Sequence, residues 1–445
     1  MSDVSREGLT GKTVVLGVQH MFVMFGATVL VPLVTGLDVG VTLFAAGLGT
    51  LLFHALTKFK VPVFLGSSFA FIPPLAAIGA SQGLPYALGG IFIAGLLYVV
   101  VAVIFHFVSV DVLHKILPPH VTGPVIILIG VILAPVAILY SIDGYVGNVQ
   151  AQIGVLGSWG VAGFTFIVGV LVKVVFPKWR MDFLSLLPVL IAMVAGYILS
   201  IAIGIVDFSA VREASWVGLP AFSLPKFSWS AISLTVPIAV VTIVEHFGDI
   251  LAIGNVAEDD YLEDPKISRT LLGDGLATSL SALIGGPANT TYSENTGAVA
   301  LTGVKNPAVM RIAAISAIIL ALVPKFTAIV GTIPAPVIGG ISILLFGMIS
   351  AIGVKNMVDA RVDMGEPKTL IIVAAMLVLG LGTGVIDQLV TDPGAGGIAR
   401  DAAFAQGAAI SIGNFSFGGL GLAAIVGILL NLIINFDTFR KKKPE

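Results

Sequence analysis

The sequence predicts an all-α polytopic membrane protein with 14 transmembrane segments in a 7+7 inverted repeat and two short extended strands in segments 3 and 10. Three observations predict this fold: the composition, the series of apolar runs and the similarity of two distant runs. Of the 445 residues, 57% are hydrophobic and 11% are charged, and the mean hydropathy is +1.06. A soluble protein needs many charged residues on its surface, so the composition excludes a soluble enzyme and favours a chain that lies in lipid.

The charge and the cysteine count exclude further classes. A net charge of −2 without a basic stripe argues against a protein that binds nucleic acid. The chain has no cysteine, which excludes disulfides, thiolate catalysis and cysteine-ligated metal.

The first apolar run follows Arg6, Glu7 and Lys12 and has no small-residue cleavage site after it. We therefore expect a first transmembrane helix there and not a cleaved signal peptide.

Apolar runs of about 20 residues, the length that crosses a bilayer, recur along the whole chain. In order, they cover 14–34, 39–57, 61–80, 86–108, 119–140, 158–176, 184–205, 229–252, 269–285, 288–303, 309–330, 335–353, 369–385 and 405–436. The runs at 61–80 and 288–303 are interrupted by Gly, Pro and hydroxyl residues and predict poor helices. The Gly-rich polar stretch 385–404 predicts an outer loop.

The basic residues give the orientation of these segments. With the N-terminus in the cytoplasm, the predicted cytoplasmic segments contain all but four of the 23 Lys and Arg residues. The exceptions are Arg212, Lys226, Lys325 and Arg400. Because cytoplasmic loops of membrane proteins are enriched in Lys and Arg, we expect a multi-pass protein of the cytoplasmic membrane with both termini in the cytoplasm.

Two distant runs resemble each other. Gln19-His20 in the first run and Glu245-His246 in the eighth both follow apolar residues, and an interrupted run follows each pair at a similar distance. Two halves of seven segments are therefore predicted, and because seven is odd, the second half is inverted in the membrane. Inverted repeats with paired interrupted helices are typical of secondary transporters that bind substrate near the middle of the membrane. The sequence has no GxxxxGK[ST] motif for nucleotide hydrolysis.

Ionisable residues inside spans are candidate functional residues, because a charge there costs about 2.5–3.5 kcal/mol on insertion scales. Glu245 and Asp249 share one helix face in the eighth run, and Glu294 lies in the interrupted run 288–303. No Lys or Arg lies near them within either run. A carboxylate without a cation in a medium of low dielectric favours its protonated form, and neighbouring carboxylates share protons. These three are candidates for proton coupling, together with His246, which is either a proton relay or a structural hydrogen-bonding residue.

The two interrupted runs predict short extended segments, each followed by a half-helix. One contains GSSFAFIPP from Gly66, and the other contains TTYSEN from Thr290. Ser, Thr, Tyr and Phe suit extended chain, and we expect the two segments to pair at the middle of the membrane. The N–H groups at the start of each half-helix then point to the same place. With Glu245 and Glu294, this arrangement suits a small planar polar solute that carries N–H and C=O groups.

At these residues the chain resembles the nucleobase–ascorbate transporter family, and within it the bacterial members that carry uracil. The resemblance covers about residues 12–436. The family signature [QEP]-N-x-G-x4-T-[RKG] is met from Glu294 to Gly303. The other matching segments are Gln19-His20, MFGATVLVP at 24–32, Gly66–Phe71, Val244–His246 and Gly286–Asn295.

The resemblance implies two domains and a set of site residues. A core domain that binds substrate comprises residues 12–116 and 229–330 (segments 1–4 and 8–11), and a gate domain comprises 117–206 and 331–436 (segments 5–7 and 12–14). Substrate is expected to contact the side chains of Glu245 and Glu294 and the backbone of Phe69 and Ser293, with Ala27 and Tyr292 lining the site. Gln19, His20, Ser68 and Asn295 are expected to form a supporting polar network.

The implied function is proton-coupled import of uracil by alternating access. The expected partners are a nucleobase, protons and membrane lipid, with no nucleic acid, cofactor or metal, and a homodimer through the gate domains is implied.

Asp249 keeps a purine alternative open, Glu294 argues against it, and Ser293 is a departure from the uracil carriers. Asp249 stands where some uracil carriers of the family have His and purine carriers often have Asp. Glu294 stands where purine carriers usually have Gln, and Ser293 stands where uracil carriers have Gly. A purine or xanthine symporter is therefore the alternative. An anion exchanger of the same architecture is disfavoured, because it needs a positive site where Glu245 and Glu294 stand, and a membrane-embedded enzyme lacks a catalytic constellation.

Overall fold

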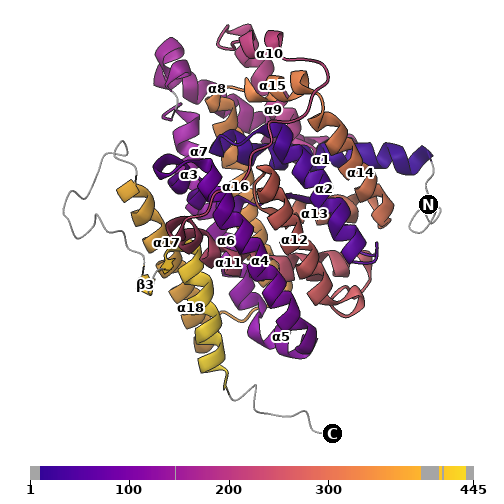
Figure 1. The fold of residues 1–445 in the computed structure, drawn as a ribbon, viewed down its shortest axis with the longest axis vertical. Coiled ribbons are helices and arrows are strands. Elements are labelled where there is room, and N and C mark those ends of the chain that lie inside the picture. The colour runs from indigo at the N-terminus through magenta and orange to yellow at the C-terminus, as the bar shows by residue number, and fades with distance from the viewer. Residues whose placement is uncertain (1–10, 146, 392–409, 413–414, 437–445) are drawn as a thin grey trace.

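The protein is almost entirely helical, as predicted (Figure 1). The computed structural model describes residues 11–145, 147–391, 410–412 and 415–436. The first half contains α1 (Gly11–Thr35), α2 (Val39–Leu56), β1 (Leu65–Ser67), η1 (Phe69–Phe71), α3 (Ile72–Ser81), α4 (Leu84–Phe107), α5 (Val110–Ile116), α6 (Pro119–Ile132), α7 (Ala134–Ser141), α8 (Asn148–Val175), η2 (Phe176–Trp179), η3 (Leu184–Leu186), α9 (Pro188–Ala202) and α10 (Ser209–Glu213). The second half contains α11 (Trp229–Ala257), η4 (Leu262–Lys266), α12 (Ile267–Ile284), β2 (Asn289–Thr291), α13 (Ser293–Thr302), α14 (Pro307–Ala321), α15 (Pro324–Gly331), α16 (Ala335–Asp359), α17 (Pro367–Thr391), β3 (Ile410–Ile412), β4 (Phe415–Phe417) and α18 (Gly419–Ile434).

The helices are those of a multi-pass membrane protein. Within the described residues, eight helices are long and apolar enough to cross a membrane, and α14 with α15, which meet at 86°, form a bent ninth candidate. Other predicted spans contain shorter apolar helices, at Phe69–Ser81, Pro188–Ala202 and Gly419–Ile434, so the count of 14 stays a prediction. The run 119–140 is one of the eight candidates, although α6 gives way to α7 at Leu133, with Pro135 in the first turn of α7. Pro has no N–H to continue the hydrogen bonding of α6.

The C-terminal part differs from the prediction of one span over 405–436. β3 and β4 pair antiparallel, with Ile410 opposite Phe417, before α18 begins at Gly419. Apolar residues alternate with Ser in these strands, and this alternation suits a strand and not a helix. α17 extends to Thr391, so the predicted outer loop 385–404 begins later, and its remainder lies outside the described residues.

The helices pack in two groups. In the first, α12 packs against α2 and α4, and α14 packs against α1 and α2. In the second, α16 packs against α6, α7 and α8, while α17 packs against α6 and α18. The two groups meet at two places. α11, which packs against α4 of the first group, contacts α6 and α18 of the second, and α1 contacts α9, which packs against α8 of the second group. Figure 1 shows α10 and α15 together at one end of the molecule and α5 at the opposite end.

Candidate functional site

The two interrupted segments meet as a pair of short strands. β1 and β2 run antiparallel with Leu65 opposite Thr291, and every residue of both strands is buried. A Cβ on Gly66 would overlap the ring of Tyr292, so this close crossing requires glycine. The structure therefore confirms the predicted extended segments and their pairing.

A threonine of a neighbouring helix satisfies backbone groups of each strand. Thr50 in α2 accepts a hydrogen bond from the N–H of Leu65 at 2.9 Å. Thr278 in α12 accepts one from the N–H of Asn289 at 3.2 Å and donates one to its carbonyl oxygen at 3.0 Å. In a membrane, each buried backbone group needs a partner within the protein. The two strands thus use the same kind of contact, and the inverted repeat stays a prediction.

A half-helix begins directly after each strand. η1 and α3 begin at Phe69 and Ile72, and α13 begins at Ser293. α3 and α13 each have 10 residues. The first N–H groups of a helix have no partner within it, and this end carries partial positive charge. Glu294 is in the first turn of α13, so its carboxylate lies beside these backbone donors.

Four carboxylates form an acidic cluster centred on Glu245. Glu245 on α11 interacts electrostatically with Asp249, Asp274 and Glu294. Asp249 and Asp274 are buried, whereas Glu245 and Glu294 are half-buried in otherwise buried surroundings. Within the described part of the chain, no ion pair joins Glu245 or Glu294 to a Lys or Arg. These two carboxylates are therefore the accessible acceptors of the site.

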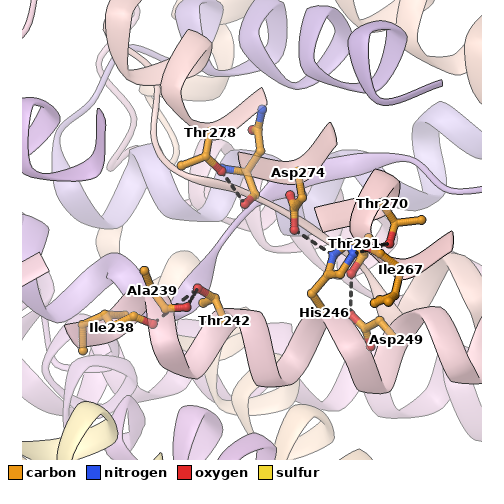
Figure 2. Close-up of polar contacts among 11 residues, drawn as sticks. Ile238, Ala239, Thr242, His246, Asp249, Ile267, Thr270, Asp274, Thr278 and Thr291 are labelled. Carbon is orange, nitrogen blue, oxygen red and sulfur yellow. Dashed lines mark hydrogen bonds and ion pairs between the residues drawn. The ribbon is translucent and has the colours of Figure 1, made fainter. Parts of the chain in front are cut away.

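Asp274 forms a buried pair with His246 that the sequence analysis did not anticipate (Figure 2). Their Oδ2 and Nδ1 atoms are 2.9 Å apart, and both side chains are completely inaccessible. The Nε2 atom of His246 lies 3.0 Å from the hydroxyl of Thr270, which itself donates to the carbonyl of Ile267. Because a hydroxyl has one proton, we infer that Nε2 donates to Thr270 and that one proton lies between Nδ1 and Asp274. Both ring nitrogens thus lie close to protein groups, and the role of His246 as a proton relay or a structural residue stays a prediction.

A sequence criterion already used for Glu245 would also have identified Asp274. It lies inside the predicted span 269–285 and is ionisable, which is the criterion that selected Glu245.

Asp249 is connected to the second strand. The hydroxyl of Thr291 in β2 donates to its Oδ2 atom at 2.8 Å (Figure 2). Since α13, which carries Glu294 in its first turn, begins two residues after β2, this bond links α11 to the segment that positions Glu294. The role of Asp249 in proton coupling stays a prediction.

Three aromatic rings line the ends of the strands. The rings of Phe69 and Tyr292 are nearly parallel, at 13°, with centroids 6.2 Å apart. The Tyr292 hydroxyl donates to the carbonyl of Ser67 at 2.8 Å. Phe346 of α16 packs edge-on against Phe69 at 5.9 Å, so it joins the second helix group to the site. An aromatic residue in an apolar run has no distinguishing signal, and the sequence did not predict Phe346.

Four other predicted site residues lie near β1 and β2 and are connected to them in different ways. Asn295 donates to the carbonyl of Pro62 at 2.9 Å and holds the chain that enters β1. Ser68 is buried and its N–H donates to the carbonyl of Ala288 at 2.8 Å. Ala27 is buried on α1, which contacts β1 and α13. The backbone of Ser293 begins α13, and its side chain lies outside what the structure describes.

Gln19 and His20 lie on α1, half-buried and buried respectively. In the described ranges, neither ring nitrogen of His20 has a hydrogen-bond partner. Their membership of a supporting network stays a prediction.

Comparison with known proteins identifies the family. Residues 11–389 match the family model described as "Permease family". The chain belongs to this permease family. The permease is 40% identical to the uracil permease of Bacillus caldolyticus over 438 residues, which cover 97% of the permease and 94% of that protein. It is 37% identical to the uracil permease of Bacillus subtilis strain 168 over 422 residues, which cover 94% and 91%.

A solved structure has the same fold. The inward-facing structure of murine solute carrier 26 family member A9, an anion transporter, aligns with a TM-score of 0.67 and 12% identity over 98% of the permease and 70% of that chain. The family membership confirms the prediction that the permease is a transporter and not an enzyme. It also confirms the resemblance to the nucleobase–ascorbate transporters.

Proposed function

We propose that the permease is a proton-coupled symporter that imports uracil across the cytoplasmic membrane by alternating access. The identity to uracil permeases over nearly the whole chain supports the substrate. The observation that carries the proposal is the crossing of β1 and β2, which brings two helix N-termini together with accessible carboxylates. Uracil is a small planar ring whose edge alternates N–H and C=O, and it matches such a set of donors and acceptors.

The proposed contacts divide the work between side chains and backbone. The carboxylates of Glu245 and Glu294 accept hydrogen bonds from the ring N–H groups. The N–H groups at the starts of η1 and α13, at Phe69 and Ser293, donate to the carbonyl oxygens. Tyr292 and Ala27 line the site, and the ring stack of Phe69 with Tyr292 limits it on the side of the strands.

Proton coupling follows from the acidic cluster. Glu245 is half-buried, has three carboxylates for neighbours and forms no ion pair with a cation in the described residues. Four carboxylates in a medium of low dielectric are not all ionised together, so protons enter the cluster from the side of higher proton concentration. In this proposal Glu245 and Glu294 bind the proton, while Asp249 and His246 adjust the cluster through Thr291 and Asp274.

Alternating access is proposed as movement of the core domain (12–116 and 229–330) against the gate domain (117–206 and 331–436). The contact of Phe69 with Phe346 lies between these two sets of residues, so it opens or closes as they move. The distribution of Lys and Arg supports cytoplasmic termini. The resemblance supports a homodimer through the gate domains.

The test is uptake of labelled uracil into proteoliposomes, with and without an inward proton gradient. Unlabelled uracil, xanthine and sulfate serve as competitors. We expect accumulation that needs the gradient and that only uracil blocks. Uptake blocked by xanthine would favour the purine alternative, and sulfate-sensitive flux without a proton requirement would favour an anion exchanger.

A pair of variants tests the role of the carboxylate. Glu245→Gln should abolish uptake driven by the gradient. Glu263→Gln is the matched control, because Glu263 is exposed in η4, outside the site. Gradient-driven uptake that survives in Glu245→Gln would contradict the assignment of Glu245.

A further inference from the structure

The chain between α10 and α11 crosses the ends of four helices of the first group. We call residues 214–228 the crossing segment. Its backbone is fixed at several points: the N–H of Gly218 donates to the carbonyl of Leu322 at 3.2 Å, and the N–H of Lys226 donates to that of Pro85 at 2.8 Å. Between these points, the N–H of Ser223 donates to the carbonyl of Ile284 at 3.2 Å. The segment therefore has a defined path across α14, α12 and α4.

Side chains of the segment add to this attachment. Phe222 packs edge-on against Phe44 of α2, and Phe227 packs in the same way against Phe92 of α4. A Cβ on Gly89 in α4 would overlap the carbonyl of Lys226, so the segment is seated directly on that helix. The crossing segment is thus part of the packed structure.

The opposite face of the segment is apolar and uncovered. Trp216, Leu219 and Leu224 are 72%, 77% and 74% exposed, and Trp229 at the start of α11 is 62% exposed. Soluble surfaces rarely gather large apolar side chains in this way. The backbone of the segment is hydrogen-bonded to the helices while its apolar side chains point away from them, which indicates that these side chains contact an apolar phase.

The surroundings indicate lipid as that phase. The helices below the segment expose apolar side chains along their lengths, such as Ile319 on α14 and Val100 on α4, and these face the bilayer in a multi-pass protein. The exposed apolar face of the crossing segment extends this bilayer-facing surface at the ends of the helices. Lys325 lies over the ring of Trp216 at 5.4 Å. Trp rings and Lys side chains are typical of the boundary between headgroups and acyl chains, where the cation meets lipid phosphate.

We propose that the crossing segment and the first residue of α11 lie in the membrane interface and insert Trp216, Leu219, Leu224 and Trp229 between phospholipid headgroups. Because its backbone is bonded to α4, α12 and α14, the segment sets the depth at which this helix group sits in the bilayer.

Tryptophan fluorescence tests the proposal on the full chain. The chain has four Trp residues, so a variant that keeps only Trp216, with the others changed to Phe, reports on the segment. The control has all four changed to Phe and carries Glu263→Trp at an exposed polar position. Both are reconstituted in vesicles of phosphatidylcholine and phosphatidylglycerol that contain lipids with a nitroxide at the headgroup or deep in the acyl chain.

We expect the headgroup nitroxide to quench Trp216 more than the deep one, with less quenching by aqueous iodide than in the control. Iodide quenching equal to the control would place the segment in water and overturn the proposal. Protection from both iodide and lipid nitroxides would show that a second protein surface covers it, and would also overturn the proposal. A variant that keeps only Trp229 repeats the measurement if the first one fails to fold, and uracil uptake checks the fold of each.

Discussion

Removing one partner of the buried His246–Asp274 pair should destabilise the permease strongly. Asp274→Leu keeps a similar side-chain volume but leaves the imidazole without its acidic partner. Both side chains are 0% exposed and their atoms are 2.9 Å apart, so no water can replace the lost contact. Breaking a buried pair in this way costs about 3–5 kcal/mol. Replacing both partners with apolar residues is often neutral, so we expect His246→Leu with Asp274→Leu to recover most of the loss.

The measurement is the apparent midpoint of thermal unfolding in detergent at one fixed scan rate, because large proteins often unfold irreversibly. The control is the exposed Lys355–Asp359 pair, with side chains 71% and 59% exposed. Asp359→Ala should cost only about 0.3–0.5 kcal/mol. The reasoning is refuted if Asp274→Leu lowers the midpoint no more than Asp359→Ala does. It is also refuted if the double variant is destabilised by the sum of the two single changes.

Three further predictions concern other contacts. Thr291→Val removes the donor to Asp249 and should cost about 1.5–3 kcal/mol, while Thr291→Ser should keep the midpoint near that of the unchanged protein. Asn431→Leu removes the hydrogen bonds from its Nδ2 atom to carbonyls at the end of α5 and the contacts of its Oδ1 atom with His120 and Asn435, which should cost at least about 1–3 kcal/mol and speed proteolysis between α4 and α6. The hydrogen bond from Lys60 lowers the pKa of the exposed Asp264 carboxyl, so this ion pair stabilises the fold above about pH 4 and is lost as pH falls through the lowered pKa. The midpoint difference between the permease and Asp264→Asn should therefore be small and constant near neutral pH and vanish on acidification.

Much of the candidate site could be predicted because its signals are local. Gly66 and the Pro residues after it break a helix wherever they stand in a span, and the structure has β1 and η1 there. Glu245 and Glu294 stand out because a charge in an apolar run is costly by itself. The C-terminal strands were missed, since an apolar run of suitable length predicts a helix before its alternation with Ser is weighed against it.

Local sequence features could not predict which residues contact each other in the site. Nothing in the spacing of His246 indicates that Asp274 is its partner, because the two lie on separate helices that meet only after folding. Phe346 is one of many apolar residues of its run, and only the packing of α16 brings it to Phe69. The exposed apolar face of the crossing segment is likewise visible only once the other face is seated on the helices.

The sequence by itself determined that this chain lies in a membrane, where its helices are interrupted and which carboxylates lie within them. These are properties of single residues and short windows, because transfer to lipid and helix breaking depend on local composition. Only the tertiary structure decided the partners: Thr291 for Asp249, Asp274 for His246 and Phe346 for Phe69. Each of these contacts joins residues distant in the chain, and its energy arises from burial and geometry that exist only after the helices pack.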